Sequence, residues 1–217
     1  MISAETHERK YIDEEEIMKE YTIIRRPDTL CWSDVPALCI DTPMHPLTAP
    51  VEAKAQLCYD DTHLYVRLTA VESNIRAEHK GLLCEICEDS CLEFFFSPVC
   101  GDLRYFNLEC NLNGAIYLGM GTGIDDLIRL VFAEGAPFTP ETKETENGWE
   151  VIHAIPHAFV RLFFPEYNPA PGYQMRANFY KCGDLTDHPH YLMWNPVPQA
   201  PRASFHQPDK FGILRFS

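Results

Sequence analysis

YFNLECNLNG, residues 105–114, alternates polar and apolar side chains along its first eight positions. A strand places alternate side chains on opposite faces, so the apolar half is expected to face a core and the polar half to face outward. Asn113-Gly114 is a strong hairpin signal, because type I′ turns need positive φ at both central residues. The stretch predicts a half-buried strand at 104–112 that turns into a second strand at 115–119.

Further runs of this kind lie on both sides of the stretch. They predict strands at residues 53–59, 63–71, 91–97, 127–133, 138–145, 149–155, 173–181 and 211–216. Asp60-Asp61 and Asn147-Gly148 are turn signals between runs, and residues 157–164 fit one or two turns of helix. Many short strands without long intervening helices are typical of a sandwich or a barrel. We predict an all-β fold, an antiparallel β-sandwich of immunoglobulin-like or jelly-roll-like form.

No repeat and no linker-like stretch divides the chain, so residues 25–217 are expected to form a single domain. Residues 1–24 carry an acidic run at 13–16 and follow a helical stripe only loosely. They predict a short helix or an arm on the domain edge. The proline-rich residues 27–50 predict an irregular lead-in, with Trp32 docked on the core.

The composition narrows the possible partners. Hydrophobic residues make up 46% of the chain, which is enough for a sizeable core, and the formal net charge is −14. A chain this acidic is repelled by nucleic acid and by anionic membranes, so neither is an expected partner. The sequence shows no signal-peptide pattern and no long apolar span, which predicts a cytoplasmic location and leaves the oligomeric state open.

Nine cysteines are present, so at least one cannot pair within the chain. Most are expected to be reduced, buried thiols. Cys84-Glu-Ile-Cys87 with Cys91 suggests zinc or iron–sulfur ligation, although the chain lacks a matched second Cys pair. His188 and His190 near Cys182 raise the same possibility, and hydrogen bonding is the simpler explanation for them.

Polar side chains gather on one face of the strands predicted at 91–97, 104–112 and 173–181. Carboxylates, amides and an arginine supply directed donors and acceptors for sugar hydroxyls, and aromatic faces stack on the C–H face of a pyranose ring. An ordinary solvated sheet face is the alternative. The candidate ligand-binding residues on this face are Glu93, Asn107, Glu109, Asn111, Arg176, Asn178 and Tyr180.

Three motifs together resemble a known family. They are Tyr59-Asp-Asp-Thr-His-Leu-Tyr-Val66, Asp89-Ser-Cys-Leu-Glu93 followed by three phenylalanines, and Phe205-His-Gln-Pro-Asp-Lys-Phe-Gly-Ile-Leu-Arg-Phe216. Their order from about residue 30 to the C-terminus is similar to that of the family 9 carbohydrate-binding modules and their DOMON-like relatives. The resemblance implies an antiparallel sandwich that holds a sugar end between two aromatic clamps and a polar set.

By position, Glu93 resembles the family's binding glutamate, and Asn107 and Glu109 lie on the strand that carries its polar contacts. Phe205 stands where the second clamp aromatic is expected. The first clamp tryptophan is replaced by Ile86-Cys87-Glu88, and Trp194 is a candidate substitute. The implied function is non-catalytic binding of an oligosaccharide or polysaccharide end, linked to carbohydrate catabolism.

The resemblance also implies structural calcium, for which Asp60, Asp61 and Glu72 are the candidate ligands; a plain aspartate turn is the alternative. A glycoside hydrolase that cleaves O-glycosyl bonds with Glu93 and Glu109 as paired carboxylates is a second functional class. A DOMON-like haem or metal domain is a third. Its candidate haem ligands include Met120, Met175 and Met193, which core packing explains more simply.

Overall fold

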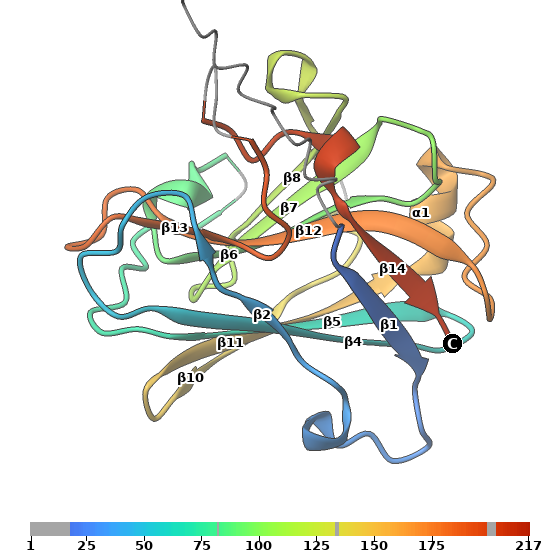
Figure 1. Cartoon of the computed structure of the whole chain (residues 1–217), viewed down its shortest axis with the longest axis horizontal. Helices are drawn as coiled ribbons and strands as arrows, with labels where there is room; N and C mark the ends of the chain where they lie inside the picture. The colour runs from blue at the N-terminus through green and yellow to red at the C-terminus, as the bar shows by residue number, and fades with distance from the viewer. Residues whose placement is uncertain (1–17, 82, 133–134, 199–202) are drawn as a thin grey trace, which may run out of the picture.

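The computed structural model describes residues 18–81, 83–132, 135–198 and 203–217, and strands dominate it. Two sheets pack face to face, which confirms the all-β sandwich (Figure 1). The β5 sheet contains β10 (Glu141–Thr145), β11 (Gly148–Pro156), β5 (His63–Val71), β4 (Glu52–Tyr59) and β2 (Leu38–Ile40). The β6 sheet contains β14 (Gly212–Phe216), β12 (Gln174–Gly183), β6 (Cys91–Ser97), β7 (Tyr105–Asn111), β8 (Ile116–Gly121), β9 (Ile128–Arg129), β13 (His190–Met193) and β3 (Thr42–Pro43).

Strand β1 (Glu20–Arg25) joins the two sheets. Its first part pairs in parallel with β14 of the β6 sheet, and Ile24 and Arg25 pair in parallel with β4 of the β5 sheet. The domain therefore includes residues 20–24, which the sequence assigned to an N-terminal arm. Residues 1–17 of that predicted arm lie outside the described residues.

The core between the sheets follows from strand alternation. Phe94 and Phe96 of β6 point into it and stack on each other with ring centroids 4.5 Å apart. Val66 of β5 and Trp149 of β11 face them from the other sheet and are fully buried. Helix α1 (His157–Phe163), which the sequence predicted at 157–164, closes one end of this core.

The β6 sheet is buried on its outer face as well. Every residue of β6 and β7 is buried, and the outer face carries a second apolar cluster that includes Phe95, Tyr105 and Tyr180. The prediction that the polar residues of these strands face solvent is therefore wrong. Contacts from residues 76–81, 83–90, 195–198 and 203–211 cover this face, and such loops leave no periodic signal in the sequence.

Short elements account for the remaining differences. The strand predicted at 127–133 is only the two-residue β9, and β2, β3 and β13, of two to four residues, were not predicted.

Trp32 is half-buried in a 3-10 turn, with the Arg67 guanidinium 5.9 Å from its ring, and it is outside the core. The described residues form four 3-10 turns, which are η1 (Trp32–Asp34), η2 (Ile86–Glu88), η3 (Ile124–Asp126) and η4 (Pro208–Lys210). Across the described ranges, every helix is too short or too polar to span a bilayer.

Candidate functional site

A pocket of about 430 Å³ opens on the outer face of the β6 sheet. Strands β6, β7 and β12 supply its floor, and the segments around 44–45, 184–191 and 203–206 supply its walls. The side chains that line it are Met44, His45, Cys87, Glu93, Phe95, Glu109, Ile124, Cys182, Asp184, Tyr191, Ala203, Ser204, Phe205 and His206. Its volume lies within the range of roughly 300–1,000 Å³ that is typical of small-ligand sites.

Two carboxylates stand side by side on the floor. Glu93 of β6 and Glu109 of β7 are direct partners in the antiparallel ladder. Directly opposite residues of such a pair have Cβ atoms about 4.5–5.5 Å apart, so both side chains leave the same sheet face as neighbours. The amide of Asn107 donates to Glu109 Oε1 at 2.9 Å and fixes the orientation of that carboxylate.

Burial sets the electrostatics of these acids. It raises the pKa of Glu109 to about 7, against the opposing hydrogen bond from Asn107. Burial and the neighbouring Glu109 raise the pKa of Glu93 well above its ordinary value. Burial also raises the pKa of Asp184, against a hydrogen bond from Tyr191. A protonated carboxyl can donate a hydrogen bond and an ionised one can only accept, so the floor offers both functions near neutral pH.

An aromatic wall faces the acids. The Phe205 ring stacks on Tyr180 with centroids 4.0 Å apart, and Tyr191 meets Phe205 edge-on at 6.4 Å. The next residue, His206, shares a hydrogen bond of 2.6 Å between its Nδ1 and the Tyr105 hydroxyl. The wall is therefore held by side chains of β7 and β12 beneath it.

The residues predicted from the sequence divide into three groups. Glu93, Glu109 and Phe205 line the pocket. Trp194 does not, because it lies on the opposite face of the sheet, in the core, 5.7 Å from the Phe179 ring. Its predicted role as a replacement sugar platform is wrong.

The other five predicted residues do not line the pocket. They make hydrogen bonds that fix the strands and segments around it. Asn107 orients Glu109, and Asn111 donates to Asp89 Oδ2 at 2.8 Å. Arg176 donates to the carbonyl of Phe211 at 2.7 Å. The remaining two make hydrogen bonds to segments that cover the sheet. Asn178 bonds with the backbone of Asn195, and Tyr180 donates to the carbonyl of Phe205.

Several lining residues had no periodic signal in the sequence. Asp184, His45 and His206 lie outside the predicted strands, and Tyr191 lies in the unpredicted strand β13. Cys87 is more informative, because the missing first clamp tryptophan was expected at Ile86-Cys87-Glu88. The pocket therefore has a thiol where an indole was expected.

The three carboxylates proposed for calcium do not form one site. Asp60 and Asp61 lie in the turn before β5, and Glu72 follows its last residue, so nine strand residues, roughly 30 Å, separate them. The Asp60 carboxylate accepts hydrogen bonds from the backbone of Thr62 and His63. Asp61 pairs with Arg25, and Glu72 pairs with Lys181. Residues 60–63 therefore form the aspartate turn that was the alternative to a calcium site.

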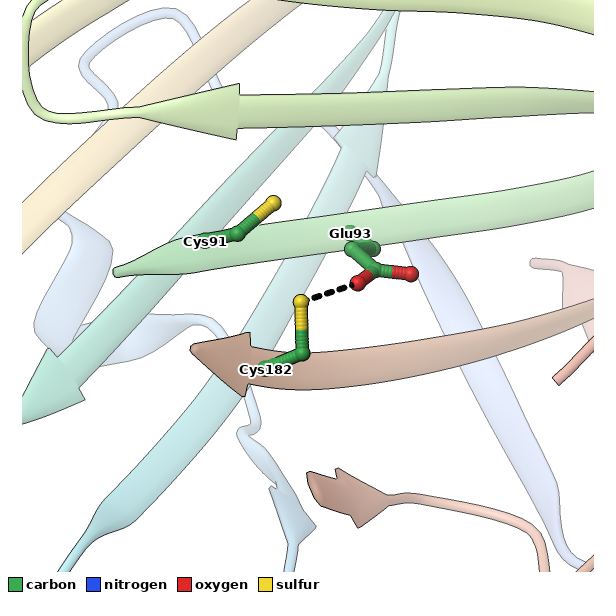
Figure 2. Close-up of side chains that lie close together, drawn as sticks. All are labelled: Cys91, Glu93 and Cys182. Atoms are coloured by element: carbon green, nitrogen blue, oxygen red, sulfur yellow. Dashed lines mark hydrogen bonds between the residues drawn. The ribbon is translucent and has the colours of Figure 1, made fainter. Parts of the chain in front are cut away.

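The other two predicted sets of metal ligands, Cys84 with Cys87 and Cys91, and Cys182 with His188 and His190, do not come together as sets among the described residues. All nine cysteines are free, and four of them are buried. His190 contacts Lys181 and Glu72. Within the described part of the chain, one group of metal-capable atoms lies close together: Cys91, Glu93 and Cys182 (Figure 2).

A larger hollow of about 590 Å³ lies between the end of β5 and the β10–β11 hairpin, but no aromatic side chain lines it.

Two packed sheets with a concave, carboxylate- and aromatic-lined pocket on one face define a β-sandwich ligand-binding module. The chain belongs to carbohydrate-binding family 9, whose model matches residues 28–216.

Solved structures show the same fold. A candidate carbohydrate-binding protein from Bacteroides uniformis superposes with a TM-score of 0.73 at 24% identity, covering 93% of this chain and all of that one. A family 9 module from Caldicellulosiruptor kristjanssonii in complex with cellotriose gives a TM-score of 0.63 at 14% identity, covering 92% of this chain and 94% of that one. Its glucose complex gives the same score and identity, with 92% and 96% covered. No curated protein matches the chain.

Proposed function

We propose that the domain binds a terminal sugar unit of an oligosaccharide or polysaccharide in the pocket on the outer face of the β6 sheet, without cleaving it. The observation that carries the proposal is the pairing of two buried carboxylates, Glu93 and Glu109, with an aromatic wall at Phe205 in a pocket of about 430 Å³. Hydroxyl recognition needs directed donors and acceptors, and the apolar face of a sugar ring needs an aromatic surface. Both occur in this pocket.

The charge of the pocket indicates which sugars fit. Glu93, Glu109 and Asp184 line it, so an anionic sugar such as a uronate would be repelled. A neutral sugar can accept a hydrogen bond from a protonated carboxyl and donate to an ionised one. The related fold from Caldicellulosiruptor kristjanssonii has been determined with cellotriose and with glucose, which makes these two the first ligands to test.

The arrangement of the acids favours binding over hydrolysis. A glycosidase places its two carboxyl groups on either side of the scissile bond. Glu93 and Glu109 leave the same floor from adjacent strands, so a sugar would rest on both of them. Retention of an oligosaccharide for a separate hydrolase, as part of carbohydrate catabolism, is the role we propose.

Isothermal titration with glucose, cellotriose and a panel of other neutral oligosaccharides tests this proposal. We expect one ligand class to bind the wild type and to lose at least about tenfold in affinity with Glu93→Gln, because a loss of about 1.4 kcal/mol is tenfold. Glu141→Gln, an exposed acid on β10, is the matched control and should bind normally. Equal affinity in the Glu93→Gln variant would place the sugar elsewhere.

A further inference from the structure

Two thiols and a carboxylate meet at the base of the pocket, with one of the thiols buried behind the other two groups. Cys91 of β6 and Cys182 of β12 are direct partners in the ladder, and Glu93 lies two residues along β6 on the same face (Figure 2). The Sγ atoms of both cysteines and a carboxylate oxygen of Glu93 all lie within 4.8 Å of one another. Cys182 Sγ donates to Glu93 Oε1 at 2.7 Å.

We propose that Cys91, Cys182 and Glu93 form a binding site for a thiophilic divalent cation of the Zn²⁺ class. Zinc binds thiolates at about 2.3 Å and carboxylate oxygens at about 2.0–2.2 Å with tetrahedral geometry, so two of its ligand atoms lie roughly 3.5–3.8 Å apart. Small side-chain rotations reach this separation from the present arrangement. Because the backbone of two paired strands holds the ligands, the site needs no loop movement.

The surroundings also favour a cation. Glu109, Asp184 and Cys87 line the same pocket. Together with Cys91, Glu93 and Cys182 they make six acidic groups or thiols at this place. Lys181 and Arg129 are the positive side chains whose charges act on Glu93 and Glu109, and both have other partners. Lys181 bonds to Glu72 and His190 on the opposite face, and Arg129 bonds to the Cys84 carbonyl and lies over Tyr117.

The pocket gives the ion a route of entry. Glu93 and Cys182 line it, while Cys91 lies behind them and is fully buried. A cation held by three protein ligands would have its fourth position toward the pocket, where water or a ligand hydroxyl can coordinate, as in open zinc sites. Binding replaces the thiol protons of Cys91 and Cys182, which are released to solvent. This inference does not depend on sugar binding.

Cobalt titration of the reduced, full-length protein tests the site directly. We expect one equivalent of Co²⁺ to give a thiolate-to-cobalt charge-transfer band and the visible bands of tetrahedral cobalt, and one equivalent of Zn²⁺ to abolish both. Cys91→Ser and Cys182→Ser should each weaken cobalt binding at least about tenfold, since each removes a direct ligand. Cys58→Ser, another buried thiol, is the matched control and should keep the wild-type spectrum.

Two results would overturn the site. One is a wild-type protein, with its thiols shown to be reduced, that gives no thiolate-to-cobalt band. The other is a band that survives in both folded variants, which would assign cobalt binding to other thiols such as Cys87. If a serine variant fails to fold, the alanine variant at the same position replaces it, with circular dichroism as the check. Sugar titration after chelation of all metal separates this outcome from failure of the proposed carbohydrate binding.

Discussion

Tyr180 supports Phe205 in two ways at once. Their rings are stacked 4.0 Å apart at an interplanar angle of 15°, and the Tyr180 hydroxyl donates to the Phe205 carbonyl at 2.9 Å. The first contact fixes the ring and the second fixes the backbone. A strand residue therefore positions a wall residue 25 positions away in the sequence.

Tyr180→Phe separates these two contacts. The variant keeps the stacked ring and loses the hydrogen bond, so the free energy of unfolding should fall by about 1 kcal/mol and sugar affinity only a few-fold. Tyr180→Leu removes the stacking as well and should cost roughly a further 1 kcal/mol. Urea unfolding and calorimetric titration measure both effects. Unchanged sugar binding in Tyr180→Leu would show that the wall needs no support from β12.

Removal of the wall ring itself should weaken both sugar binding and stability, because Phe205 is buried against Tyr180. Phe205→Ala takes away the aromatic surface, and about 1.4 kcal/mol of lost interaction weakens sugar affinity about tenfold. Leu185→Ala removes an apolar side chain that is exposed and does not line the pocket, so its affinity should stay at the wild-type value. The same titration on both variants decides whether Phe205 contacts the sugar.

Glu109 should make the protein less stable as the pH rises. Its pKa is raised from 4.5 to about 7, so the folded state binds more protons than the unfolded state between these values. Stability from this group is fully present below about pH 4.5 and is lost as pH rises through about 7, a change of roughly 3 kcal/mol. Glu109→Gln should remove this dependence.

Urea unfolding at about pH 5 and about pH 8 measures that change. Because other groups titrate in the same range, the informative quantity is the difference between wild type and Glu109→Gln at each pH. The variant should gain stability over the wild type at the higher pH only. A gain of the same size at both values would mean that Glu109 is ionised throughout.

His153 is a buried polar side chain whose two ring nitrogens lack hydrogen-bond partners among the described residues. Burial lowers its pKa to about 3, so the folded protein holds it neutral while the unfolded chain protonates it as pH falls below about 6.5. His153→Phe should raise the free energy of unfolding by about 1–2 kcal/mol at neutral pH. It should also reduce the loss of stability between about pH 6 and pH 4.

His157→Phe is the matched comparison for that prediction. His157 is also buried, but it contacts the Asp60 carbonyl at 3.0 Å and the Tyr167 hydroxyl at 3.2 Å. Its replacement should therefore lower stability. Thermal or urea unfolding of both variants gives the sign directly, and a destabilised His153→Phe would point to a partner for that ring, such as a buried water.

Strands with clear alternation could be predicted from sequence, and their burial could not. The runs at 91–97, 105–111 and 63–71 have the predicted bounds or differ by a residue, because a period of two and adjacent turn residues specify a strand locally. Burial of the polar face depends on contacts with other segments, for example 25 positions (Tyr180 to Phe205) and 101 positions (Tyr105 to His206) away along the chain. A local signal did exist: Cys91 and Phe95 on the outer side of β6 are apolar, which is typical of a strand covered on both faces.

In the candidate site as well, the residues on regular strands could be predicted from the sequence and the residues on loops could not. Glu93 and Glu109 lie on regular strands, so their alignment follows from the predicted faces. Tyr191, Asp184 and His206 join them through loops and a four-residue strand whose path has no period. Cys182 faces Cys91 because two strands far apart in sequence are neighbours, and topology of this kind is not encoded in either strand alone.

Strand β1 has a consequence for how the domain folds. Glu20 of β1 forms an ion pair with Arg215 of β14, 195 positions later in the sequence. The strand β1 pairs with β14 at its start and with β4 at its end. Closing a loop of that length is entropically unfavourable, so this contact is expected to form late and to slow folding. During synthesis, β4 and β5 can form a hairpin as soon as they emerge, but the seam between the two sheets has to wait for β14.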